Sequence, residues 1–337
     1  MNLLYLSRTG SNMSGEYSGL QARIKKHNAK ALYILCAAHF LNLIGSCAAE
    51  SCLQATEFFM LLNELYFFFS SSTARWDILK QTLSESENGD GEARNNLLPK
   101  KLSATRWSAG ADATRALYSC YDSYQNALQN LVDDPNQPPV TKVQATGLRA
   151  AISKLETGIL LEVWNKLLPK FDSVSKTLQK QSTDVSLVTK LYDSLILYVS
   201  SLRTDETFEE IEQNAKDLTK CNIYKLEVNR IRIRKQAFDD SKEIETNFDE
   251  KQNMKINTFY VILNNLSSER IRRQIAYERV SNTFGFMGSL CHLSDNQISI
   301  EAANLWQRYQ SELDRDFAEE CIQFKYFLKA LKEENKE

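Results

Sequence analysis

The sequence is poor in glycine and proline, the two residues that most often interrupt regular structure. Its 337 residues include 11 glycines and 5 prolines, whereas average usage would give roughly 40 of the two together. No glycine lies between Gly158 and Gly285, and no proline follows Pro169. This scarcity excludes a collagen-like, linker-dominated or disordered chain and predicts long helices.

An excess of charge of one sign is also missing. The 41 basic and 43 acidic residues leave a formal net charge of -2, so no overall positive field attracts the protein to nucleic acid or to an anionic lipid surface. Any contact with nucleic acid must therefore depend on a local group of basic residues.

The cysteines do not form the pattern of a disulfide framework. Their number is odd, and they are spread through apolar surroundings at Cys36, Cys47, Cys52, Cys120, Cys221, Cys291 and Cys321. This distribution favours a reducing compartment, so we expect an intracellular protein.

Long hydrophobic runs are scarce as well. The N-terminus lacks the basic region of an export signal, and its apolar run covers only residues 3–6. Residues 31–49 contain no Asp, Glu, Lys or Arg over 19 positions, which reaches the length of a membrane span. Because this run includes His39 and Asn42, and because a buried strand and a helix explain it, we expect no membrane span.

The opening part of the chain predicts an α/β arrangement. Residues 31–36 form a short apolar run typical of a buried strand, and from His39 the apolar residues recur at helical spacing. The polar, acidic stretch 84–96 predicts a flexible surface loop. We place a domain boundary near this loop.

Helical periodicity dominates the rest of the chain. Residues 160–178 predict a long helix bent at Pro169. Apolar residues at steps of three and four predict two helical faces, made of Leu117, Tyr121, Tyr124, Leu128 and Leu131, and of Leu187, Leu191, Leu195, Tyr198 and Leu202.

The last third of the sequence contains one exception to this pattern. Residues 228–235 alternate apolar and basic side chains and predict an extended segment, whereas residues 300–334 predict one long helix. We therefore divide the chain into an α/β region (1–52), connecting helices with an acidic loop (53–107) and a helical domain (108–337).

Five stretches of the sequence together carry a resemblance to a known family. They are Thr9–Ile24, Ala31–Leu43, Leu102–Ala113, Lys255–Leu263 and Thr283–Met287. In combination they resemble the hAT superfamily of transposases, and most of all its domesticated zinc-finger MYM-type protein 1 group. The likeness covers nearly the whole chain, although the amino-terminal zinc finger of that group is absent.

The resemblance implies a partial ribonuclease H-like core over 1–52, followed by a large helical insertion domain, in a mainly helical nuclear protein. Active relatives hold two divalent metal ions with two aspartates and a glutamate. The family pattern places Arg8 at one aspartate position, and the other two acids fall outside the chain. The resemblance therefore implies an inactive protein without a cofactor; Mg²⁺ or Mn²⁺ is expected only if a longer, active chain exists.

The resemblance also assigns candidate nucleic-acid contacts. Trp107 aligns with a tryptophan that stacks on an extruded base, Arg106 precedes it, and Cys36 and His39 belong to a Cys-x-x-His element near the family's active centre. Trp107 has a structural alternative, in which it fills the seam between the core and the insertion, and Cys36 and His39 have one as a packed structural cysteine and histidine. No second Cys/His pair completes a zinc site around Cys36 and His39.

A basic strip is the remaining candidate for phosphate binding. It consists of Arg230, Arg232, Arg234 and Lys235, and could be extended by Lys25, Lys26, Lys100, Lys101 and Arg106. Runs of charge more often form a solvated face, so this alternative stays open.

Three functions are compatible with the sequence. The first is a transposase-derived, catalytically inactive protein that retains contacts with nucleic acid or with other proteins. The second is a truncated gene model of a metal-dependent hAT DNA transposase. The third is a helical protein-interaction scaffold without a role on DNA. The sequence indicates neither partner proteins nor an oligomeric state.

Overall fold

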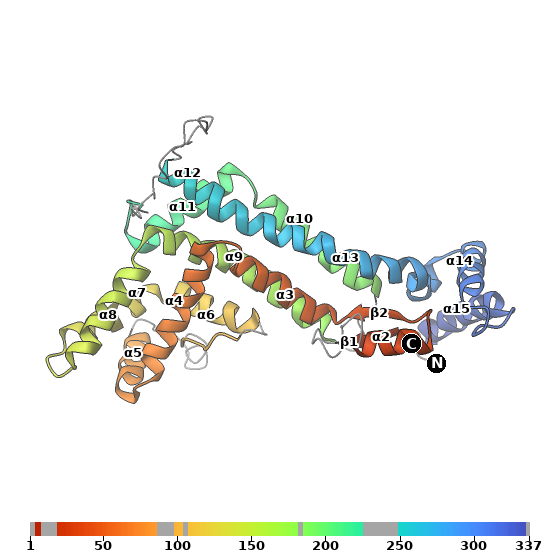
Figure 1. Ribbon diagram of the computed structural model, residues 1–337, viewed down its shortest axis with the longest axis horizontal. Coiled ribbons are helices and arrows are strands. Elements are labelled where there is room, and N and C mark those ends of the chain that lie inside the picture. The colour runs from red at the N-terminus through yellow and green to blue at the C-terminus, as the bar shows by residue number, and fades with distance from the viewer. Residues whose placement is uncertain are drawn as a thin grey trace, which may run out of the picture. The chain divides into compact units, whose positions relative to one another are not determined.

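Figure 1 shows the computed structural model of the protein, which is mainly helical. The structure describes residues 4–7, 19–85, 98–103, 107–180, 185–224 and 249–334. The long helices confirm what the scarcity of glycine and proline predicts.

Two short strands and a series of helices follow one another along the chain. Their bounds are β1 Leu4–Ser7, α2 Leu20–His27, β2 Leu32–Leu35, α3 Ala37–Ala49, α4 Leu53–Ser70, α5 Thr73–Glu85, α6 Trp107–Ser119, α7 Tyr121–Asp133, α8 Pro139–Ile152, α9 Leu155–Leu178, α10 Val185–Ser201, α11 Asp205–Thr219, α12 Glu250–Met254, the π-helix Lys255–Phe259, α13 Tyr260–Gly288, the 3₁₀ helix Leu290–His292, α14 Asp295–Arg308 and α15 Phe317–Glu334.

The chain divides into two compact units, each built from separate segments. Unit 1 contains Met1–Leu41, Val174–Ile196 and Ser268–Glu337, and unit 2 contains Asn42–Ser173 and Leu197–Ser267. The division into 1–52, 53–107 and 108–337 follows the order of the sequence and stays a prediction.

Unit 1 contains a small parallel sheet. β1 and β2 pair from Leu4 opposite Leu32 to Ser7 opposite Leu35, and α2 supplies the crossover that a parallel pair requires. The strand predicted at residues 31–36 is thus confirmed. No further strand occurs among the described residues, and no ribonuclease H-like sheet is seen there. Two strands of four residues each are too few to form a stable sheet by themselves, so burial depends on helices.

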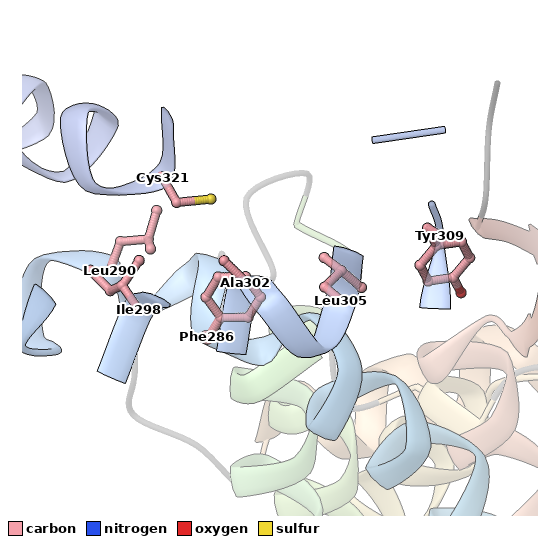
Figure 2. Close-up of a cluster of buried hydrophobic side chains, with 7 residues drawn as sticks. All are labelled: Phe286, Leu290, Ile298, Ala302, Leu305, Tyr309 and Cys321. Carbon is pink, nitrogen blue, oxygen red and sulfur yellow. The ribbon is translucent and has the colours of Figure 1, made fainter. Parts of the chain in front are cut away.

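Unit 1 also contains a small hydrophobic cluster around α14 and α15, which Figure 2 shows in close-up. One long helix was expected over residues 300–334, but the chain leaves helical structure between Arg308 and Phe317. Folding back in this way lets α15 cover α14 instead of extending away from it. The buried members of the cluster are Phe286, Leu290, Ile298, Ala302, Leu305, Tyr309 and Cys321.

The core of unit 2 is built from α4, α7 and α9. The predicted face of Leu117, Tyr121, Tyr124, Leu128 and Leu131 is buried, although the helix is interrupted at Cys120 between α6 and α7. On α9, Trp164 is buried and its ring meets that of Phe59 edge to face, at 4.9 Å between centroids. Pro169 lies inside α9, so the long helix predicted over 160–178 is confirmed, whereas the bend stays a prediction.

The face predicted for α10 is displaced by one residue. Leu187 is exposed, and the buried side chains are Val188, Tyr192, Leu195 and Val199. Tyr192 can be buried because its hydroxyl donates a hydrogen bond of 2.7 Å to the carbonyl oxygen of Ala37. The predicted face therefore shares Leu195 with the buried one, whereas Leu187, Leu191 and Tyr198 are each followed directly by the residue that is buried.

The helices also bear on the expectation about membranes. None of the helices within the described ranges is long and apolar enough to cross a membrane.

Candidate functional site

Cys36 and His39 lie where β2 passes into α3, in unit 1. The carbonyl oxygen of Cys36 accepts the backbone N–H of Phe40 at 2.9 Å, so Cys36 occupies the N-cap position and His39 lies in the first helical turn. Both side chains are half-buried.

Tyr192 of α10 contacts this first turn of α3. Besides the hydrogen bond from Tyr192 to Ala37, the Tyr192 ring packs edge to face on Phe40, with 6.0 Å between the centroids. Two contacts within this one turn, both made by Tyr192, hold the Cys-x-x-His element in one position. This local packing is compatible with the structural alternative for Cys36 and His39.

A metal centre does not form around this element within the described ranges. No three His, Cys, Asp or Glu side chains there are grouped so that they could hold a metal ion. Arg8, at the position that the family pattern gives to an aspartate, lies outside the described residues.

The second candidate, Trp107, is the first residue of α6 in unit 2. The structure describes its backbone position, whereas Arg106 lies outside the described residues. The roles given to these two residues by the resemblance stay predictions.

Two lysines close to Trp107 in the sequence have partners within unit 2. The Lys100 ammonium pairs with the Asp112 carboxylate of α6 at 2.7 Å, and the Lys101 ammonium lies over the Phe67 ring of α4, 5.7 Å from its centroid. These contacts hold residues 98–103 to two helices. They also reduce the charge that Lys100 and Lys101 could offer to phosphate.

Lys25 and Lys26 lie in the last turn of α2 and are exposed. Basic side chains at this end interact favourably with the partial negative charge of a helix C-terminus. The helix C-terminus therefore explains the position of Lys25 and Lys26 in structural terms. Both ammonium groups remain exposed to solvent.

A buried carboxylate that the sequence analysis missed organises one surface of unit 2. Glu212 of α11 is only 4% exposed. Its two oxygens bind the Lys216 ammonium at 2.9 Å, the Lys251 ammonium at 2.7 Å and the Tyr224 hydroxyl at 2.9 Å. We call these four residues the Glu212 clamp.

The electrostatics of the Glu212 clamp favour the ionised carboxylate. Burial by itself would raise the pKa of Glu212, but the hydrogen bonds from Lys251, Lys216 and Tyr224 outweigh burial and hold that pKa below its ordinary value. Burial and the bond to the Glu212 carboxylate raise the pKa of Tyr224 well above its ordinary value. The clamp is therefore an ionised, fully bonded structural group.

The basic strip Arg230, Arg232, Arg234 and Lys235 lies outside the described residues, in the segment 225–248. The Glu212 clamp holds both flanks of this segment, because Tyr224 directly precedes it and Lys251 follows it closely. Of the sequence signals, the Glu212–Lys216 spacing of one helical turn could have indicated part of the clamp. Nothing local in the sequence indicates Tyr224 or Lys251 as further partners.

A second buried carboxylate, Glu162 of α9, also lies in unit 2. Burial raises the pKa of this carboxyl, and burial together with the Glu162 charge raises the pKa of its partner Tyr118 to about 12. A single carboxyl with a tyrosine partner cannot supply the clustered acids that two-metal chemistry needs.

No known family model matches the chain, and no solved structure matches it. The resemblance to hAT transposases therefore depends on the sequence stretches that carry it.

Proposed function

We propose that this protein is derived from an hAT transposase, is catalytically inactive, and retains nucleic-acid binding through the basic strip Arg230, Arg232, Arg234 and Lys235. By the same resemblance, the nucleus is its compartment. The observation that supports binding is the Glu212 clamp, which attaches both flanks of the segment carrying the strip to α11.

The clamp supports binding because attaching the two flanks of the segment reduces the conformational entropy that the segment loses on binding. A free basic tail loses much conformational freedom when it is placed along a phosphate backbone, whereas a segment fixed at both ends has less freedom to lose. The alternation of residues 228–235 predicts an extended segment, in which the three arginines share one face and can contact successive phosphates.

Catalytic inactivity follows from the charge at position 8. An arginine in place of a metal-binding aspartate repels a divalent cation instead of neutralising it. The proposed role is therefore binding without cleavage, with no metal ion required.

Fluorescence anisotropy with the full chain and labelled duplex and hairpin DNA tests this function. We expect binding at low salt, with log K falling linearly as log salt rises. The variant R230E/R232E/R234E should abolish most of this binding and reduce the salt slope by about 3, since about three phosphate contacts are lost.

A matched control reverses three exposed basic residues elsewhere. The variant K80E/R149E/K190E changes the net charge by the same amount, at side chains that are exposed on α5, α8 and α10. It should weaken binding far less than R230E/R232E/R234E. An absence of binding at low salt, or equal losses in the two variants, would count against the proposed function.

A further inference from the structure

The sequence between Glu16 and Glu50 contains no aspartate or glutamate, although the whole chain has slightly more acidic than basic residues. This stretch includes α2 and the turn that follows it, and its basic residues are Arg23, Lys25, Lys26 and Lys30. None of these four side chains forms an ion pair with a carboxylate of the described residues. This part of unit 1 is therefore locally positive.

Tyr309, at the C-terminal end of α14, connects the turn after α2 to a further basic residue. Its side chain is fully buried and belongs to the hydrophobic cluster of Figure 2. The Lys30 ammonium lies 5.8 Å from the centre of the Tyr309 ring, and the Arg308 guanidinium lies at the same distance. The Tyr309 hydroxyl also donates a hydrogen bond of 3.4 Å to the carbonyl oxygen of Lys30. Two cations from distant segments of the chain thus meet at one buried ring.

Neutral groups hold both of these cations in place. The Lys30 ammonium donates to the Ser311 hydroxyl at 3.3 Å, and Nη1 of Arg308 donates to the Thr283 hydroxyl at 3.3 Å. Glu312 is exposed on the turn after α14, but no carboxylate in the described part of the chain pairs with Lys30 or Arg308. A neutral partner orients a cation without cancelling its charge, so both charges can attract an anion.

The chemistry of these donors fits phosphate. A guanidinium presents a fork of N–H groups that matches two phosphate oxygens, and an ammonium adds a compact charge beside it. The exposed Lys25 and Lys26 continue the positive charge along α2, which suits a chain of phosphates better than a single ion. Apart from Leu20, no large apolar side chain of α2 or of the turn after it is strongly exposed, whereas the centre of a protein–protein interface is apolar.

We propose that Lys30 and Arg308, held at Tyr309, form a phosphate-binding site for nucleic acid, which Lys25 and Lys26 extend along α2. The two side chains lose little freedom on binding, because the buried ring and the two hydroxyl groups already position them. The site lies wholly in unit 1 and uses no residue of the basic strip. The inference rests on the proposed function for the identity of the ligand, and it adds a second place of contact.

Fluorescence anisotropy with the full chain and the labelled duplex and hairpin DNA tests this site. The variant K30Q/R308Q removes two positive charges without introducing a negative one. It should weaken binding at low salt by about tenfold or more, and it should reduce the salt slope by about 2, since two phosphate contacts are lost.

Two further variants separate the local site from overall charge and from misfolding. K80Q/R149Q removes the same charge from exposed positions on α5 and α8, and should weaken binding by less than about threefold. K30R/R308K keeps both charges at the site and should keep the salt slope of the unaltered chain. Thermal denaturation followed by circular dichroism measures whether each variant is folded.

The outcomes distinguish this site from the basic strip. Equal losses in K30Q/R308Q and K80Q/R149Q would overturn the site, because only overall charge would then matter. A loss in R230E/R232E/R234E with none in K30Q/R308Q would remove this inference and leave the proposed function standing, whereas the reverse result would support the site and count against the strip.

Two other results would also reject the site. If the unaltered chain bound no DNA at low salt, both the proposed function and this inference would fail. If K30Q/R308Q abolished binding to vesicles that contain phosphatidylserine but left DNA binding unchanged, the ligand would be a membrane surface and not a nucleic acid.

Discussion

Glu212 illustrates, at the scale of single residues, how one buried charge can join distant parts of the chain. Its carboxylate is bonded to a lysine of the same helix, to Tyr224 and to Lys251 of α12. A buried charge of this kind is tolerated because each oxygen has a donor. Removing the charge leaves two ammonium groups without their counter-ion.

We expect E212Q to lower the free energy of unfolding by about 2 kcal/mol, because hydrogen bonds to a charged group contribute about 1.5 to 3 kcal/mol. Chemical denaturation followed by circular dichroism measures this loss. The matched control is E210Q, which removes an ion pair with Lys166 whose glutamate is 59% exposed; it should cost less than about 1 kcal/mol. Equal costs for E212Q and E210Q would show that the Glu212 clamp has no special role.

At the scale of elements, α14 is defined at its start by a capping box. The hydroxyl of Ser294 accepts the backbone N–H of Gln297 at 3.3 Å, and the Gln297 side chain accepts the backbone N–H of Ser294 at 3.0 Å. Two backbone donors that the helix itself cannot satisfy are thus bonded.

We expect S294A to lower the free energy of unfolding by about 1 kcal/mol, the usual cost of losing an N-cap. Denaturation of the full chain measures the change. The control is S194A, in the middle of α10, where the exposed hydroxyl donates to the carbonyl oxygen of Leu191 in the same helix. Its effect should stay within about 0.5 kcal/mol. If both substitutions had the same effect, the capping box would not be stabilising α14.

At the scale of the whole molecule, the carboxyl groups give stability a definite dependence on pH. The pKa is lowered at Asp134 by the Gln137 side chain, at Asp205 by Tyr260, at Asp295 by Lys325, and at Glu212 by the bonds of its clamp, which outweigh burial. Burial raises the pKa at Glu162. Among the carboxyls of the described residues, those with a lowered pKa thus outnumber those with a raised pKa.

A carboxyl whose folded-state pKa is lowered contributes stability above its unfolded pKa and loses it as pH falls through the folded value. Glu162 acts in the opposite direction. We therefore expect the free energy of unfolding to fall from about pH 5 to about pH 3. Denaturant titrations across this range measure the slope, and E212Q should make it shallower. A stability that rises on acidification would contradict this sign.

Two compact units built from separate segments could not be predicted from the order of the sequence. Changes of composition along the chain indicate where one kind of segment ends, but they carry no information on which distant segments pack together. The Glu212 clamp could not be predicted for the same reason, because Lys251 follows Glu212 only after a long intervening stretch.

The candidate site was likewise predictable only in part. The sequence placed Cys36 and His39 after a strand, and the structure puts them at the β2–α3 junction. The contact of Tyr192 with Ala37 that holds this junction was not predicted, because the apolar spacing places Leu191, one position earlier, on the buried face of α10.

The sequence by itself determined the helical character of the protein, the strand at residues 31–36 and the continuation of α9 across Pro169. These features depend on local backbone preferences and on the spacing of apolar residues, both of which can be read from residues close together in the sequence. Only the tertiary structure decided the buried face of α10, the break between α14 and α15, and the partners of Glu212. The buried face of α10 and the contact of Glu212 with Lys251 depend on segments that are distant in the chain. The break between α14 and α15 depends on packing of one helix against the next, which the local pattern does not show.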